Sequence, residues 1–336
     1  MKRKQELILD RVLPYSHIST GIEQTIDFIK GRRDGKVPSL KTSKNKFNDV
    51  FLDGVDWFRI LTIAGLSGSG KSTILEEFKR DFFELNPQQD FEMLSFEFEM
   101  RIEDQLARSI APKLGISVKE MYSQSWQLSE DKLKKVIAAL NSKPNRPQFY
   151  INEIGSVTEV EKTILQFVED RQLVEKNKGI VITLDHALLT KGKMTDKEKD
   201  KIDELMHAFV AMKQYFSSIG LKCIFIVLSQ LNRDIESNER ILNPYLHYPK
   251  KNDIFAASSV YYCSDYVMVT HKPANIPGMR EHYGPPIDGW PFGLPVYSPK
   301  DNKTPMIYWH IIKERFGEPT VLMMLDDLKN SQVLEY

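Results

Sequence analysis

The chain has 336 residues, 41% of them hydrophobic and 27% charged, which excludes a disordered or fibrous protein and allows one large domain or two smaller ones. Its 46 basic side chains balance 46 acidic ones, so no overall field draws it to nucleic acid or an anionic membrane, and any polyanion contact must be local. No apolar run reaches the length of a membrane span and the N-terminus lacks the apolar stretch of a signal peptide, so we expect a cytoplasmic protein without a membrane partner.

Residues 1–45 form a basic and polar arm around one predicted helix, residues 21–32. Ile22, Ile26, Phe28 and Ile29 give this helix an incomplete apolar face, and such a helix cannot bury itself alone. Two interpretations stay open, since the arm either docks on a neighbouring subunit or packs back on its own domain. Residues 46–336 are expected to form the main domain.

Residues 65–72, with the sequence GLSGSGKS, fit the pattern G-x-x-x-x-G-K-[ST] without a mismatch. An apolar run over residues 59–64 predicts a strand before this segment, and helical spacing over residues 73–85 predicts a helix after it. In such a loop, backbone N–H groups surround the phosphates, Lys71 reaches the β- and γ-phosphates, and Ser72 holds Mg²⁺. An ordinary glycine-rich turn is the weaker alternative. The sequence therefore predicts ATP and Mg²⁺ as ligands, with nucleotide contacts from Gly65, Ser67, Gly68, Ser69, Gly70, Lys71, Ser72 and Thr73.

Two later segments carry acids that suit this chemistry. Residues 91–100 are expected to be extended, and alternation places Glu97 and Glu99 on one face. An acid at the end of a strand beside the nucleotide loop can polarise an attacking water, although a solvated strand end would look the same. Residues 179–185 form an apolar run that ends in Asp185, which is typical of a strand that brings an acid to the Mg²⁺ water shell.

The middle of the chain alternates between helices and strands. We expect two or three helices over residues 102–142, a strand over 149–154, and a helix from the capping box at Ser156 to about residue 177. Residues 222–228 predict a buried strand that leads to Gln230, whose side chain either reports the γ-phosphate or caps a turn. Cys223 and Cys263 lack C-x-x-C spacing, so we expect buried free thiols and no metal site. This order predicts an α/β fold with a mostly parallel central sheet flanked by helices.

The last hundred residues contain less regular segments. Residues 234–259 are polar and irregular, and Lys250, Lys251 and Asn252 are candidates for lining a nucleic-acid channel. Residues 266–270 predict another strand. The stretch 273–305, rich in proline and glycine, is too long for an ordinary connection and is expected to be functional or mobile. Residues 306–312 and 320–325 predict a closing hairpin whose connection carries Lys313 and Arg315.

The order of these motifs over residues 20–326 resembles the RecA-like motor domain of DnaB-type hexameric replicative helicases, including phage versions, which have the P-loop NTPase fold. Residues 99–106, EMRIEDQL, resemble the family's Glu-Met…Gln-Leu segment, whose glutamate activates water; one residue of extra spacing leaves Glu97 as the alternative to Glu99. Residues 182–188 resemble the family's Walker B stretch, with His186 and Ala187 in place of the usual tyrosine and leucine. The strongest similarity is residues 228–233, LSQLNR, followed by residues 313–317, KERFG.

The resemblance implies a homo-hexamer in which Lys313 and Arg315 reach the γ-phosphate of the neighbouring subunit, so that ATP turnover depends on assembly. It also implies a DNA helicase that acts on single-stranded DNA in phage or bacterial replication, with primase or a loader as a partner. The family's N-terminal collar domain is missing, and residues 253–259 lack the arginine of the family's DNA loop, which leaves DNA contacts to Lys250, Lys251 and backbone N–H groups. Two rivals are a RecA/KaiC-like ATPase that does not unwind DNA and a non-enzymatic nucleotide-switched module.

Overall fold

The structure is a computed structural model that describes residues 17–98, 100–125, 127–142, 146–185, 198–279 and 281–336. The chain divides into two compact units, residues 1–39 and residues 40–336. The described part of the first unit contains α2 (Ile18–Arg33), after which Arg32 Nη1 donates to the carbonyl of Val37 at 3.0 Å and to Ser39 Oγ at 2.8 Å. The apolar side chains of α2 that the sequence singled out are exposed, with Ile22 at 53% and Ile29 at 60%.

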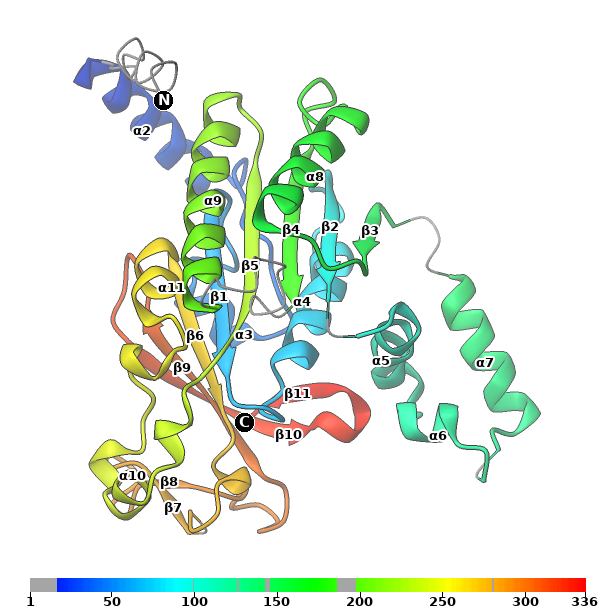
Figure 1. Cartoon of the computed structure of the whole chain (residues 1–336), viewed down its shortest axis with the longest axis vertical. Coiled ribbons are helices and arrows are strands. Elements are labelled where there is room, and N and C mark those ends of the chain that lie inside the picture. Colours follow the sequence, from blue (N-terminus) through cyan, green and yellow to red (C-terminus); the bar gives the residue numbers. More distant parts are fainter. Residues whose placement is uncertain (1–16, 99, 126, 143–145, 186–197, 280) are drawn as a thin grey trace. The chain divides into compact units, whose positions relative to one another are not determined.

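The second unit is built on a nine-stranded sheet with the order β11-β10-β9-β6-β1-β5-β4-β2-β3 (Figure 1). The six strands from β6 to β3 are parallel, whereas β9, β10 and β11 are antiparallel to their neighbours. The prediction of a mostly parallel sheet is therefore confirmed. The strands are β1 (Arg59–Gly65), β2 (Phe91–Glu97), β3 (Gln148–Ile151), β4 (Gly179–Asp185), β5 (Cys223–Gln230), β6 (Tyr266–His271), β9 (Met306–Lys313), β10 (Thr320–Asp327) and β11 (Gln332–Glu335).

Helices cover both faces of the sheet, because the central strands are apolar on both sides. On one face, α8 (Val157–Asp170), α9 (Glu198–Ser218) and α11 (Ala257–Cys263) pack on side chains such as Ile60, Ile182 and Phe225. On the other face, α3 (Asn45–Val50) and α4 (Lys71–Leu85) pack on side chains such as Leu61 and Val181. No helix among the described residues is both long and apolar enough to span a membrane.

A helical extension follows β2. It consists of α5 (Ile102–Leu114), α6 (Val118–Tyr122) and α7 (Glu130–Asn141), and Figure 1 shows it at the side of the sheet where β2 and β3 lie. Its small core contains Ile110, Ile116 and Val136. In contrast, Leu133 and Ile137 of α7 are 39% and 48% exposed, so the apolar side of this helix is only partly covered.

Several segments differ from the sequence prediction. The capping box of Ser156 is present, but α8 ends at Asp170 instead of near residue 177, because Gln172 adopts a φ of 53° that no α-helix allows. Cys223 and Cys263 are both free, but only Cys223 is fully buried. Residues 234–259 contain the short helices η2 (Arg233–Glu236), α10 (Asn238–Leu242), η3 (Pro244–Leu246) and η4 (Lys251–Asp253), as well as the start of α11.

Residues 273–305 fold against the end of the sheet. They contain η5 (Pro273–Asn275) and a two-stranded ribbon of β7 (His282–Tyr283) and β8 (Leu294–Pro295). Tyr283 is completely buried, and its hydroxyl bridges His271 Nδ1 at 2.6 Å and His310 Nε2 at 2.7 Å. This bridge ties the ribbon to β6 and β9. A short helix, η6 (Leu328–Asn330), leads from β10 to β11 near the C-terminus.

Candidate nucleotide site

The glycine-rich loop lies between β1 and α4, as predicted. β1 ends at Gly65 and α4 begins at Lys71, while Gly68 and Gly70 adopt φ values of 75° and 94° that other residues rarely adopt. A Cβ atom on Gly65 would collide with Ser69 Oγ and lie 2.6 Å from the carbonyl oxygen of Thr270. The loop therefore closes tightly on itself, and glycine is required where β1 turns into it.

The loop is held from two sides. Lys71 Nζ donates to the carbonyls of Gly65 at 2.9 Å and Leu66 at 3.0 Å, and Thr270 Oγ1 donates to the carbonyl of Ser69 at 2.8 Å. The first N–H groups of α4 have no acceptors within the helix, because that ladder begins only one turn later. Such N–H groups, together with the positive end of the helix dipole, form an anion site of the kind that binds phosphates.

The other predicted residues at strand ends lie on the face of the sheet that α4 covers. Side chains alternate along a strand, and Met93, Val181 and Ile226 all belong to the core beneath α4. By the same alternation, Glu97, Asp185 and Gln230 lie on this face, at the ends of β2, β4 and β5. Gln230 is directly opposite Gly65 and Glu97 is opposite Asp185 in the strand pairing.

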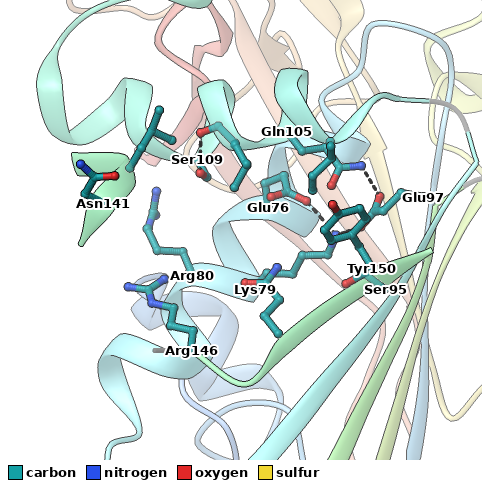
Figure 2. Close-up of a pocket in the computed structure, with 14 residues that line it drawn as sticks. Glu76, Lys79, Arg80, Ser95, Glu97, Gln105, Ser109, Asn141, Arg146 and Tyr150 are labelled. Atoms are coloured by element: carbon teal, nitrogen blue, oxygen red, sulfur yellow. Dashed lines mark hydrogen bonds and ion pairs between the residues drawn. The ribbon is translucent and has the colours of Figure 1, made fainter. Parts of the chain in front are cut away.

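Glu97 is held by a buried network (Figure 2). Its carboxylate contacts Lys79 Nζ of α4 and accepts from Gln105 Nε2 of α5 at 2.6 Å, while Lys79 Nζ also donates to Glu76 Oε1 at 2.8 Å. Burial lowers the pKa of Lys79, but the charges of Glu76 and Glu97 outweigh it and raise that pKa above its usual range. Glu99, the alternative acid, lies outside the described residues.

A cavity of about 460 Å³ adjoins this network. Glu97 and Lys79 form part of its wall, and Figure 2 shows Arg80 and Arg146 on the other side of the opening. Apolar side chains from α5 and α7 complete it: Ile102, Leu106 and Leu140. The cavity gives the end of β2 room for side chains to move, but the nucleotide loop contributes no residue to it.

The side chains proposed for Mg²⁺ have suitable chemistry. Ser72 is the second residue of α4, and Asp185 is the buried last residue of β4. Hydroxyl and carboxylate oxygens are the hard donors that Mg²⁺ prefers, and it usually keeps water and phosphate oxygens as its other ligands. Within the described part of the chain, no group of three or more His, Cys, Asp or Glu residues is arranged to hold a metal ion by itself.

Gln230 connects the nucleotide side of the sheet to the basic loop. Its carbonyl accepts from the N–H of Phe255 at 2.9 Å, and the N–H of Asn232 donates to the carbonyl of Asp253 at 2.6 Å. The exposed residues of this loop include the three DNA-contact candidates, Lys250, Lys251 and Asn252. A change at the end of β5 would therefore reach this loop through two backbone hydrogen bonds.

Lys313 and Arg315 lie at the opposite end of the sheet from the nucleotide loop. β9 pairs with β6 so that Lys313 is opposite Val267, whereas Gly65 is opposite Thr270. Lys313 Nζ donates to the carbonyl of Tyr261 at 2.6 Å at the end of α11 and lies over its ring. These contacts of Lys313 within its own chain were not evident from the sequence, where the family resemblance implied that Lys313 and Arg315 reach the γ-phosphate of a neighbouring subunit.

Two side chains that matter in this geometry were missed by sequence reasoning. Thr270 holds the loop and Lys79 pairs with Glu97. Thr270 lies at the end of a predicted strand. Its position beside the loop could have been predicted if the order of the strands in the sheet had been known. Lys79 occurs in a helix whose neighbours Ile74, Leu75, Phe78 and Phe82 are fully buried, and a lysine on that side of a helix requires a buried acid.

A glycine-rich phosphate loop between the first strand and helix of a parallel sheet, with acids at the ends of neighbouring strands, defines a P-loop nucleotide-binding protein with a RecA-like sheet. The sequence profile of the DnaB-like helicase C-terminal domain matches residues 40–322, and the chain belongs to this family. No curated protein sequence matches it.

Solved structures of low sequence identity share its fold. An ATPase domain superposes with a TM-score of 0.72 at 14% identity, covering 96% of this chain and all of that one. A DnaB-like replicative helicase, solved in a study of its interactions with primase, superposes with a TM-score of 0.70 at 15% identity, covering 96% of this chain and 68% of that one. The predicted family and fold are thus confirmed.

Proposed function

We propose that this chain is the motor of a hexameric, ATP-driven DNA helicase that moves on single-stranded DNA in phage or bacterial genome replication. The observation that carries the proposal is the separation of the nucleotide loop from Lys313 and Arg315. Asp265, which contacts Arg315, is five residues before Thr270 along β6; at about 3.3 Å per residue this is roughly 17 Å from the level of Gly65. Arg315 would therefore serve the pocket of a neighbouring subunit.

Chemistry at the shared pocket follows from the residues on the face of α4. Glu97, or Glu99 if the acid lies two residues further on, would orient water for in-line attack on the γ-phosphate. Lys71 would contact the β- and γ-phosphates, Arg315 of the next subunit would stabilise the charge that develops, and Gln230 would sense the terminal phosphate. Ser72 and Asp185 would hold Mg²⁺, which neutralises phosphate charge when bound.

Coupling to DNA would use the contacts between the end of β5 and the basic loop. Gln230 and Phe255 are joined by a backbone hydrogen bond, so the position of Lys250 and Lys251 would follow the nucleotide state. The exposed apolar side chains of α2 are proposed to dock on a neighbouring subunit. A primase or a loader is the expected partner in the cytoplasm.

The decisive experiment mixes two inactive variants. Lys71→Ala removes the phosphate contact of the nucleotide loop. Arg315→Ala removes the arginine finger, the side chain proposed to reach the γ-phosphate of the neighbouring subunit. Each variant alone should reduce turnover about 1,000-fold or more. A mixed ring contains pockets with an intact Lys71 and an intact Arg315, so ATP hydrolysis should return in the mixture. As a control, Lys71→Ala is mixed with the Lys71→Ala and Arg315→Ala double variant, which leaves no complete pocket. If the mixed particles assemble but do not hydrolyse ATP, the proposal that two subunits share each nucleotide site is wrong.

Unwinding is tested separately with a forked DNA duplex. Strand displacement that requires ATP supports a helicase, whereas hydrolysis by a hexamer without displacement favours the RecA/KaiC-like alternative. A nucleotide-switched module would show no turnover in the unchanged protein, so Lys71→Ala would have no rate to reduce.

A further inference from the structure

Asp265 is a buried carboxylate at the end of the sheet opposite the nucleotide loop. It precedes β6, and its side chain is 1% exposed. Its Oδ2 atom accepts from the N–H of Ile60 at 2.8 Å and from Lys213 Nζ of α9 at 2.7 Å. The backbone N–H of Asp265 in turn donates to the carbonyl of Ile60 at 2.8 Å. The carboxylate is therefore fixed to β1 and α9.

The second oxygen of this carboxylate faces Arg315. The distance between Asp265 Oδ1 and Arg315 Nε is 2.7 Å, which is an ion-pair contact, and Oδ1 accepts no hydrogen bond from the described part of the chain. A buried carboxylate oxygen without another donor strongly favours this ion pair, since solvent cannot replace the arginine. Arg315 itself is half exposed, at 50% of its side chain.

The geometry of the contact leaves the outer end of the guanidinium available. Arginine carries five N–H donors in a fixed plane, and the Nε–H is only one of them. The nitrogen of Arg315 that lies nearest to Asp265 is Nε, and half of the side chain is exposed, which leaves Nη1 and Nη2 available for a second acceptor. A planar group held at its inner edge presents its outer edge in a defined direction, which a freely rotating side chain does not.

We infer that Asp265 is the positioning residue of the finger: it holds Nε of Arg315 so that Nη1 and Nη2 point at the γ-phosphate bound by the neighbouring subunit. This inference rests on the proposed function, because it requires that Arg315 acts across a subunit interface. Asp265 touches no reacting atom. By ordering Arg315 in advance, it lowers the conformational entropy that this side chain has to lose when it contacts the phosphate.

The first test is Asp265→Asn in the full chain, measured as steady-state ATP hydrolysis. Because misplacement by about 1 Å can cost on the order of 100-fold, kcat should fall about 10- to 100-fold with little change in KM for ATP. The matched control is Glu92→Gln, a buried acid that meets Arg171 at 2.6 Å and Lys178 at 3.5 Å at the far side of the sheet. This control should keep kcat. A wild-type kcat for Asp265→Asn would overturn the inference.

A double variant separates positioning from a general loss of structure. If Asp265 acts through Arg315, combining Asp265→Asn with Arg315→Ala should be no slower than Arg315→Ala alone. Multiplied effects would overturn the inference. Lysine replaces the planar fork by one point charge on a flexible stem and offers no separate inner and outer edge, so Arg315→Lys should be nearly as slow as Arg315→Ala. This last comparison decides the matter if Asp265→Asn does not fold, and a fast Arg315→Lys enzyme would count against the inference.

The two levels of the proposal can fail separately. Wild-type turnover by Arg315→Ala would show that Arg315 does not act at a shared pocket. Slow turnover by Arg315→Ala together with an unaffected Asp265→Asn enzyme would remove only the positioning role.

Discussion

The amide of Gln105 donates a hydrogen bond of 2.6 Å to the carboxylate of Glu97 and so joins α5 to the end of β2. The other carboxylate oxygen contacts Lys79, which is buried in α4. Both oxygens therefore have fixed donors, and the orientation of the carboxylate is set before any nucleotide binds. Preorganised groups of this kind need little rearrangement during a reaction.

We expect Glu97→Gln to abolish most ATP hydrolysis and to leave nucleotide binding intact. Glutamine keeps the shape of the side chain and can still hydrogen-bond to water, but it cannot accept a proton from it, so kcat should fall about 100-fold or more. Turnover is compared with the affinity for a fluorescent ATP analogue. Glu103→Gln, an exposed change on α5, is the control. If Glu99→Gln is inactive while Glu97→Gln remains active, the acid is Glu99.

Lys79→Met should destabilise the protein. The change leaves Glu97, which is 1% exposed, and Glu76, which is 14% exposed, without their cation. Removing one partner of a buried ion pair typically costs about 3–5 kcal/mol, and we expect the lower end because Glu76 can reach water.

Urea denaturation measures the free energy of unfolding in both proteins. The control is Lys113→Met, since Lys113 pairs with Glu84 at the surface with 52% of its side chain exposed. A surface pair of this kind contributes about 1 kcal/mol at most. Equal losses of unfolding free energy for the two variants would mean that the buried ion pairs around Glu97 stabilise the protein no more than a surface ion pair does.

The central part of the fold follows from local sequence signals. β1 and β4 are apolar runs bounded by glycine or an acid, and the loop at residues 65–72 has a pattern that few other structures require. Because the carboxyl ends of parallel strands meet at one edge, the positions of Asp185 and Gln230 near the loop were predictable as well.

Other features depend on contacts between distant parts of the chain. The end of α8 is set by a residue with positive φ that is neither glycine nor asparagine. β11 has only four residues and exists because it pairs with the end of β10. The choice between Glu97 and Glu99 could not be made from alternation, since both have the same parity. The pairing of Glu97 with Asp185 places Glu97 at the edge of the sheet, whereas Glu99 lies outside the described residues.

The stability of the fold should decrease in mild acid because of two buried histidines. Burial lowers the pKa of His271 to about 3 and that of His310 well below its ordinary value of 6.5. Below pH 6.5 the unfolded chain binds a proton at each ring, whereas the folded protein does not, so the free energy of unfolding falls as the pH falls. Between about pH 7.5 and pH 5.5 each histidine should contribute a loss of about 1.4 kcal/mol.

Denaturation by urea at these pH values measures the loss. In His310→Gln one of these buried rings is gone, so the loss over this pH interval should be smaller by about 1.4 kcal/mol. His282→Gln changes an exposed histidine of the same ribbon and should leave it unaltered. A flat profile in the unchanged protein would show that the folded and unfolded chains bind the same number of protons over this range, which would contradict the prediction.

Thr270→Val should weaken nucleotide binding without altering the fold. The Thr270 hydroxyl donates to the carbonyl of Ser69 at 2.8 Å, and valine has nearly the same shape but no donor. We expect the free energy of unfolding to fall by about 1 kcal/mol and KM for ATP to rise several-fold, because the loop loses its restraint from β6. The control is Thr62→Val on β1, where the hydroxyl pairs with Ser264 Oγ at 2.7 Å and does not contact the loop. If both variants lose the same stability and both keep the original KM, the bond supports the sheet but does not shape the phosphate site.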